Sequence, residues 1–164
     1  MRQLSTKQIA LNGIAAGLYA AVTVLTASFA YGPIQFRLAD ALCLLVCLEP
    51  SITVGLTVGC LIANIFSTAT LLDMIVGTAA TLLGCLLTQN IRRIWLMPLP
   101  TVLCNAALVG AMLAWVSTGE NGFWQAFGLF GAQVAFGELA VLYVLGVPLY
   151  FSTKKSGFLK KLLH

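Results

Sequence analysis

The segment LADALCLLVCLEP (residues 38–50) decides the fold, because the number of membrane crossings depends on whether it spans the bilayer. Its apolar run ends at Glu49-Pro50-Ser51. The run holds only about eleven apolar residues, whereas a spanning helix needs about 20, and runs of this length more often form re-entrant or interfacial pieces. The rest of the chain must therefore show whether residues 38–49 cross.

The chain around this segment is too apolar for a water-facing domain. Of its 164 residues, 60% are hydrophobic and 9% are charged, and the mean hydropathy is +0.97. Soluble domains carry about 25% charged residues. Inside a bilayer every backbone polar group must be paired within the protein, which leaves helix bundles or closed barrels. The apolar runs are long and do not alternate as barrel strands do, so the sequence predicts one all-α integral membrane domain over residues 1–164.

Charge distribution settles the predicted number of helices. Further apolar runs predict helices at roughly 8–29, 52–68, 71–90, 98–117 and 123–151. Eight of the nine basic residues form three groups, which are Arg2/Lys7, Arg92/Arg93, and Lys154, Lys155, Lys160 and Lys161. Basic residues favour the cytoplasmic side of short loops. All three groups lie inside only if residues 38–49 cross, so we predict six transmembrane helices with cytoplasmic N- and C-termini.

This topology leaves one basic residue, Arg37, on the external side. It lies in FAYGPIQFRLAD (residues 29–40), where Gln35 also offers an amide. Arg37 and Asp40 are spaced i,i+3 at the start of the predicted second helix, and this spacing favours a local ion pair. We therefore expect Arg37 and Asp40 to brace this external segment.

Glu138 is the strongest candidate for a ligand-binding residue. It lies about halfway along the sixth predicted helix, and ionisable groups within spans are costly and indicate function. At about 100° per residue, Gly131 lies above it on the same face, with Ala135 and Trp124 near that stripe. This pattern predicts space for a ligand that enters from outside. The alternative is a glutamate that only joins helices.

Other polar residues within the predicted helices are open to two interpretations. Asp73 begins the fourth helix, where Thr70-x-x-Asp73 resembles a capping box, so it is either a cap or a ligand group. Asn64, near the external end of the third helix, either binds a ligand or bridges helices. Asn105 and Gln133 are weaker candidates of the same kind.

Small residues on the first predicted helix allow another helix to approach closely. They form two ladders, Gly13-x-x-x-Gly17-x-x-x-Ala21 and Ala16-x-x-x-Ala20. Ladders of this kind permit close helix contact. They serve packing within the chain or face another subunit.

The sequence offers no catalytic or metal-binding pattern. The five cysteines all lie in apolar runs without a CxxC pair, and the single histidine is the terminal His164, so no metal site is predicted. There is no G-x-x-x-x-G-K-[ST] phosphate loop, no GxSxG and no HExxH motif. We therefore expect no catalytic residue and no cofactor in this chain. The pattern favours a membrane subunit that binds a solute and obtains energy from a partner or an ion gradient.

Three segments resemble the QueT family over nearly the whole chain. They are GPIQFR (residues 32–37), GCLIAN (residues 59–64) and LLDMIVGTAATLL (residues 71–83), in this order and spacing. The family's first motif more often continues with Ser-Glu where this chain has Ala39-Asp40, a change that keeps the acid.

The resemblance implies a substrate-binding S component of an energy-coupling factor (ECF) transporter. Its substrate would be the queuosine precursor 7-aminomethyl-7-deazaguanine. Its partners would be a transmembrane T component and two cytoplasmic ATPases that use ATP, in the cell membrane of a prokaryote. Neither an enzymatic activity nor a nucleic-acid partner is expected.

Site residues implied by the resemblance fall into three groups. Carboxylates suit the donor-rich ring edge and the ammonium of this ligand, and aromatic faces suit its flat ring. The expected substrate-binding residues are Glu138, Asp73, Asn64, Gln35, Trp124, Tyr31, Gln133 and Asn105. Because the ligand is a cation, Arg37 with Asp40 is expected to brace a lid instead of holding it. The expected interface with the T component comprises Gly13, Ala16, Gly17, Ala20 and Ala21.

Two alternatives stay open at this point. One is a stand-alone, proton-coupled secondary transporter of a small cationic or nucleobase-like solute. The other is a membrane assembly subunit whose acids only bridge helices. Uptake by this chain alone would support the first, and a complete lack of small-molecule binding would support the second.

Overall fold

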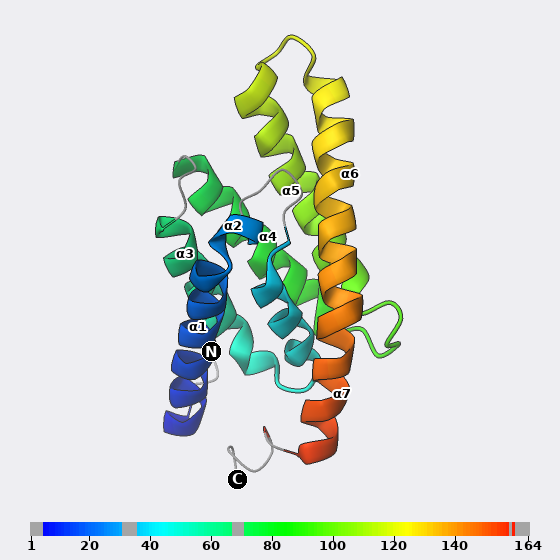
Figure 1. Cartoon of the computed structure of the whole chain (residues 1–164). Helices are drawn as coiled ribbons and strands as arrows, with labels where there is room; N and C mark the ends of the chain where they lie inside the picture. Colours follow the sequence, from blue (N-terminus) through cyan, green and yellow to red (C-terminus); the bar gives the residue numbers. More distant parts are fainter. Residues whose placement is uncertain (1–4, 31–35, 67–70, 158, 160–164) are drawn as a thin grey trace.

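The described residues of the chain form helices and no strand (Figure 1). The computed structural model describes residues 5–30, 36–66, 71–157 and 159. In chain order the elements are α1 (Thr6–Leu25), α2 (Ala27–Ala30), the 3₁₀ helices η1 (Leu38–Cys47) and η2 (Pro50–Ile52), α3 (Thr53–Ile65), α4 (Leu71–Thr88), α5 (Pro98–Thr118), α6 (Phe123–Val141), the π-helical turn η3 (Leu142–Gly146) and α7 (Val147–Ser156). Each predicted apolar run is therefore helical.

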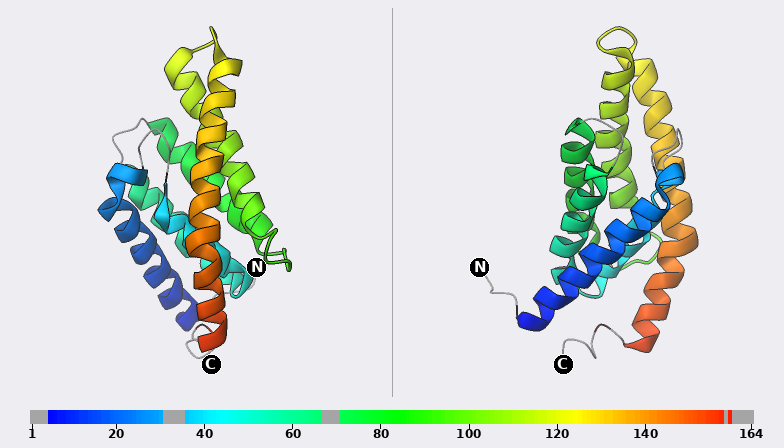
Figure 2. Two further views of the ribbon diagram at one scale, coloured as in Figure 1. Left: turned by 45° about the vertical axis from the view of Figure 1, so that its right-hand side comes forward. Right: turned by 60° about the vertical axis from the view of Figure 1, so that its left-hand side comes forward.

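The long helices pack in the order α1, α3, α4, α5 and α6, and η1 lies among them (Figures 1 and 2). It contacts α1, α3, α4, α6, η3 and α7. The segment from α6 to α7 is one continuous helix of 34 residues, Phe123–Ser156. The first residues of α1 and the last residues of α7 lie at one end of the bundle, and the α5–α6 hairpin projects at the other. The short helix that decided the sequence interpretation is thus at the centre of the fold.

Among the described residues, four helices are long and apolar enough to cross a membrane. They are Thr6–Leu25, Leu71–Thr88, Pro98–Thr118 and Phe123–Ser156, whereas Leu38–Cys47 and Pro50–Ile65 are shorter apolar helices. A 3₁₀ helix rises about 2.0 Å per residue instead of 1.5 Å, so η1 reaches about 20 Å, still short of the roughly 30 Å hydrocarbon core. The crossing of these two short helices and the cytoplasmic position of the termini stay predictions.

Glycines bring α1 and α3 into backbone contact. A Cβ on Gly55 would lie 2.8 Å from Asn12 Cα, and one on Gly59 would lie 2.6 Å from the carbonyl oxygen of Ala16. The Gly55 N–H donates to Asn12 Oδ1 at 2.5 Å. Close approach of this kind is what small residues permit between membrane helices. Gly55 and Gly59 of α3 therefore serve packing within the chain.

The structure divides the small residues of α1 between two faces. Ala16 is buried beneath α3, while Gly13, Gly17 and Ala21 are exposed and Ala20 is half-buried. A Cβ on Gly13 or Gly17 would meet nothing within 4 Å. Ala16 is therefore not available to the T component, because α3 of this chain already covers it.

Candidate functional site

Polar side chains from six elements gather in the interior of the bundle. They come from α1, the start of η1, α3, α4, α5 and α6, and none is more than 4% exposed. We call them the buried polar cluster, and its members are Tyr19, Arg37, Asp40, Cys60, Asn64, Asp73, Thr81, Asn105 and Glu138. Polar groups in an apolar interior are costly unless they are paired, so this concentration requires an explanation.

Asp40 links η1 to α1. The Tyr19 hydroxyl donates a hydrogen bond to Asp40 Oδ1, and Cys43 Sγ lies 3.9 Å from the same oxygen. The second oxygen, Oδ2, is buried and accepts no hydrogen bond from an N–H group or a hydroxyl of the described residues. The Glu138 carboxyl group lies within hydrogen-bonding range of the Asp40 carboxyl group. A ligand would therefore compete with Glu138 for this side of Asp40.

Cys60 joins η1, α3 and α4 through its sulfur atom. Thr81 Oγ1 donates to it at 3.2 Å, Asn64 Nδ2 at 3.5 Å and Arg37 Nη1 at 3.8 Å. Two buried nitrogens of Arg37, Nε and Nη2, have no hydrogen-bond partner in the described part of the chain. Asn64 Oδ1 is also buried and also lacks such a partner there. Among the described residues, a weak sulfur acceptor is thus the only hydrogen-bond partner of the buried guanidinium.

Gly77 makes room for the guanidinium on the face of α4. A Cβ there would lie 3.0 Å from Asn64 Nδ2 and 3.7 Å from Arg37 Nη1. Asp73 is four residues before Gly77 and Thr81 four residues after it, so the three positions share one face of α4. One face of α4 therefore carries the Asp73 carboxyl group, the space left by Gly77 and the Thr81 hydroxyl.

Glu138 enters the cluster from α6. Asn105 Nδ2 donates to its Oε1 at 3.2 Å, whereas Glu138 Oε2 and Asn105 Oδ1 have no hydrogen-bond partner within the described residues. The Glu138 carboxyl group also lies within electrostatic range of Asp40 and Arg37. Two acids and one guanidinium, from the start of η1 and from α6, thus lie close to one another.

The unpartnered atoms define what this arrangement can bind. A buried polar atom without a hydrogen bond costs about 1–3 kcal/mol, and more when it is charged. Such atoms occur on Arg37, Asp40, Asn64, Asn105 and Glu138. They offer both acceptors and donors. A flat molecule with several hydrogen-bonding groups and a positive charge would match this set.

Four predicted substrate-binding residues lie in the cluster, namely Glu138, Asp73, Asn64 and Asn105. Gln133 does not, because five residues place it about 140° around α6 from Glu138. It is half-buried, and its Oε1 has no hydrogen-bond partner in the described chain. Tyr31 and Gln35 lie outside the described residues.

The expected ligand space along α6 is filled by α5. A Cβ on Gly110 would lie 2.7 Å from Gly131 Cα, so these glycines allow two helix backbones to pack. Trp124 is 79% exposed at the outer end of α6. It is about 21 Å along the helix axis from Glu138. Trp124 and Glu138 therefore cannot both contact one small ligand, so the structure does not bring these two predicted residues together.

Arg37 and Asp40 are connected through the backbone and not through their side chains. The Asp40 N–H donates to the Arg37 carbonyl at 2.9 Å, which starts η1. The guanidinium turns toward Cys60 and Gly77, and the carboxyl group toward Tyr19. The expected local ion pair is absent from the contacts of the described residues, because both side chains point into the bundle.

Three cluster members were missed by sequence reasoning: Tyr19, Cys60 and Thr81. Tyr19 is on the same face of α1 as Ala16, and a buried tyrosine hydroxyl needs a partner, which was a usable signal. In the sequence, Cys60 is only one of five cysteines that lie in apolar runs. The sequence does not show that a cation from another segment reaches it.

Comparison with known proteins identifies the family of the chain. The family model described as QueT transporter matches residues 9–155. The chain is also 36% identical over 99 residues to the Queuosine precursor transporter QueT of Lactococcus lactis subsp. cremoris (strain MG1363). That alignment covers 57% of this chain and 58% of the relative, so the chain spans less than two thirds of its length. No solved structure matches. The chain is a multi-pass membrane protein and belongs to the QueT transporter family.

Proposed function

We propose that this chain is the substrate-binding S component of an ECF transporter and binds 7-aminomethyl-7-deazaguanine in the buried polar cluster. The observation that carries the proposal is the set of unpartnered buried atoms on Arg37, Asp40, Asn64, Asn105 and Glu138. They lie in a chain of a transporter family whose relative is named for a queuosine precursor. A transporter role is favoured over an enzyme by the family alone.

The chemistry of the ligand fits the cluster group by group. Its guanine-like edge carries N–H donors that suit a carboxylate, and we assign Glu138 to this edge. Its carbonyl oxygen suits the free N–H groups of Arg37. Its exocyclic ammonium suits a second acid, Asp40 or Asp73. The Tyr19 ring, fully buried beside Asp40, offers an aromatic surface to the flat base.

Energy for import would come from partner subunits. The sequence has no phosphate-loop motif, so two cytoplasmic ATPases would hydrolyse ATP and a T component would connect them to this chain. The exposed small residues Gly13, Gly17 and Ala21 form a surface on α1 where a helix of the T component can approach closely. Ala20, half-buried at its edge, completes this surface.

Calorimetry on the purified chain tests the substrate assignment. The ligand panel is 7-aminomethyl-7-deazaguanine, guanine and a thiamine or riboflavin control. We expect one-to-one binding of the deazaguanine and much weaker binding of guanine, which lacks the ammonium. Equal affinity for guanine would contradict the role of the second acid, and absence of all binding would support an assembly subunit.

A proton-coupled transporter is the second candidate, and the proximity of Asp40 and Glu138 favours it. Two neighbouring carboxyl groups can share a proton. Vesicles that contain only this chain separate the two functions. Accumulation driven by a proton gradient would overturn the S-component proposal, whereas uptake only with the ATPases and T component would support it.

A further inference from the structure

Three surface cavities follow one another at the end of the bundle that carries the chain termini. The first has a volume of about 210 Å³ and lies between α1, η1 and α7. Its lining is almost entirely aliphatic and includes Leu11, Ile14, Leu18, Leu42 and Leu149. We call it the aliphatic crevice.

The second cavity connects the crevice to a basic side chain. It has a volume of about 290 Å³ and shares Thr153 and Leu159 with the crevice. Lys154 lines its other side. The surroundings therefore change from aliphatic to cationic within one turn of α7.

The third cavity is polar and carries two cations. It has a volume of about 380 Å³ and is lined by Arg92, Lys154, Gln89, Asn90 and Tyr150, among others. The Lys154 ammonium lies 5.6 Å from the centre of the Tyr150 ring. No acidic side chain lines this cavity among the described residues. We call it the basic cavity.

We propose that these cavities form a binding site for one anionic phospholipid, with an acyl chain in the aliphatic crevice and the phosphate in the basic cavity. The order of the three cavities matches the order of groups in such a lipid. Basic pockets between membrane helices on the cytoplasmic side attract anionic head groups. The amide side chains of Gln89 and Asn90 add hydrogen-bond donors for phosphate or glycerol oxygens. The site is separate from the buried polar cluster and does not depend on the proposed substrate.

Native mass spectrometry of the full chain in a mild detergent tests this site. The probes are dioleoyl-phosphatidylglycerol, dioleoyl-phosphatidylcholine, the short-chain dihexanoyl-phosphatidylglycerol and inorganic phosphate. We expect retention of dioleoyl-phosphatidylglycerol above the other three. Lys154→Gln and Arg92→Gln should each lower its affinity about five-fold, since a basic residue near an anionic lipid surface contributes about that factor.

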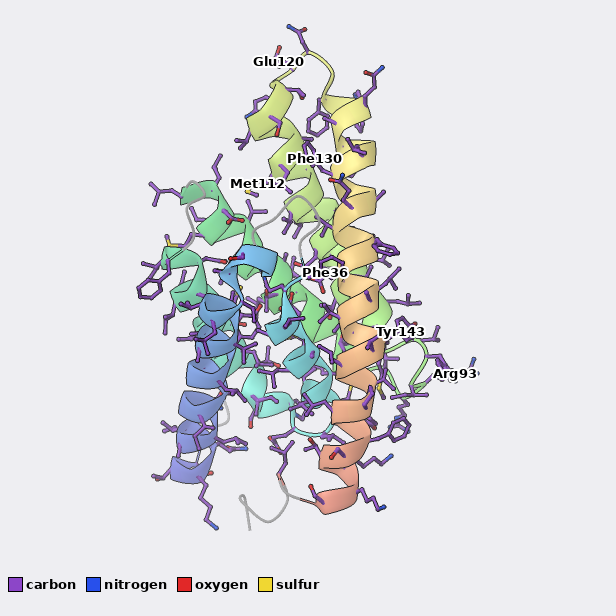
Figure 3. The ribbon with its side chains drawn as sticks, in the orientation of Figure 1. Phe36, Arg93, Met112, Glu120, Phe130 and Tyr143 are labelled. Atoms are coloured by element: carbon purple, nitrogen blue, oxygen red, sulfur yellow. The ribbon has the colours of Figure 1, made fainter. Side chains whose placement is uncertain are left out.

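The neighbouring basic residues provide matched controls. Lys155 and Arg93 are exposed and line none of the three cavities (Arg93 is labelled in Figure 3). Lys155→Gln and Arg93→Gln should change affinity less than two-fold. Equal losses in controls and test variants would show that surface charge alone attracts the lipid, which contradicts a built site. Retention of inorganic phosphate or of the short-chain lipid at the level of the dioleoyl lipid would contradict a role for the crevice.

Discussion

The buried polar cluster and the tip of the α5–α6 hairpin differ in how their side chains are satisfied. At the tip, Phe123 stacks on Phe127 with ring centroids 6.0 Å apart, and Trp124 meets Phe123 edge to face at 5.2 Å. Trp115 and Trp124 are 54% and 79% exposed. In the cluster, Arg37 and Glu138 are buried and keep unpartnered polar atoms.

This difference shows which region can hold a polar solute. Aromatic residues at the end of a membrane helix suit the membrane–water interface, and no buried polar side-chain atom among the described residues of the tip lacks a hydrogen-bond partner. The cluster gains hydrogen bonds when a ligand enters, because its donors and acceptors are already removed from water. The buried unpaired polar atoms are therefore a stronger reason than aromatic composition for proposing the cluster as the ligand site.

The largest expected effect is in the cluster, at Asp40. Asp40→Asn preserves the shape and the acceptor for the Tyr19 hydroxyl but removes a negative charge from a fully buried position. Affinity for the deazaguanine should fall about 100-fold, near the upper end for a hydrogen bond to a charged group. Calorimetry measures the loss, and the thermal midpoint of the ligand-free variant shows whether the bundle is intact. Unchanged affinity would remove Asp40 from the site.

Filling the gap at Gly77 should have the next largest effect. Gly77→Leu would push against Asn64 and the Arg37 guanidinium. Overpacking costs about 1–3 kcal/mol. A cost of about 2 kcal/mol corresponds to a loss of affinity of about 30-fold. Gly128→Leu is the matched control, because a Cβ there meets nothing within 4 Å. Equal weakening of binding by Gly77→Leu and Gly128→Leu would contradict a specific role for the space at Gly77.

Helix positions were largely predictable from the sequence, whereas the interior was not. Long apolar runs ending at charges gave α4 and α5 close to their observed bounds. The 3₁₀ geometry of η1 was unforeseen, because apolar composition does not distinguish an α helix from a 3₁₀ helix. A helical projection places Gly131 above Glu138, but it cannot reveal that the backbone of α5 fills that space.

The same limit applies to the site residues. Glu138 and Asp73 were found because acids in apolar helices are conspicuous. Arg37 was assigned to a local ion pair because i,i+3 spacing is visible in the sequence, while its contact with Cys60 on α3 is not. Only the three-dimensional structure shows that the guanidinium turns inward.

A smaller effect is expected at Tyr19. Tyr19→Phe keeps the ring but removes the hydroxyl that donates to Asp40 Oδ1. Loss of one such bond costs about 1 kcal/mol, which corresponds to roughly five-fold weaker binding if Asp40 loses its orientation. Titration calorimetry with the deazaguanine measures this. Tighter binding to the phenylalanine variant would mean that the hydroxyl competes with the ligand for Asp40.

The aromatic tip should give the smallest effect. Trp124→Ala removes a side chain that is 79% exposed and distant from the cluster. Affinity should change less than two-fold, even if insertion into the membrane is weakened. A ten-fold loss of affinity in the purified Trp124→Ala variant would show that the tip contributes to the ligand site. It would contradict the difference proposed between the tip and the cluster.

The most direct test of the central claim is the affinity of Glu138→Gln for 7-aminomethyl-7-deazaguanine, measured by calorimetry beside the unmodified chain. Glutamine preserves the size of the side chain and the acceptor for Asn105 Nδ2, so the ligand-free bundle should keep its thermal midpoint. The buried polar cluster predicts a loss of about 100-fold, because glutamine places an NH₂ donor opposite the N–H donors of the ring edge, where glutamate offers an acceptor oxygen. Binding at the original affinity would contradict the account and place the substrate elsewhere in the chain.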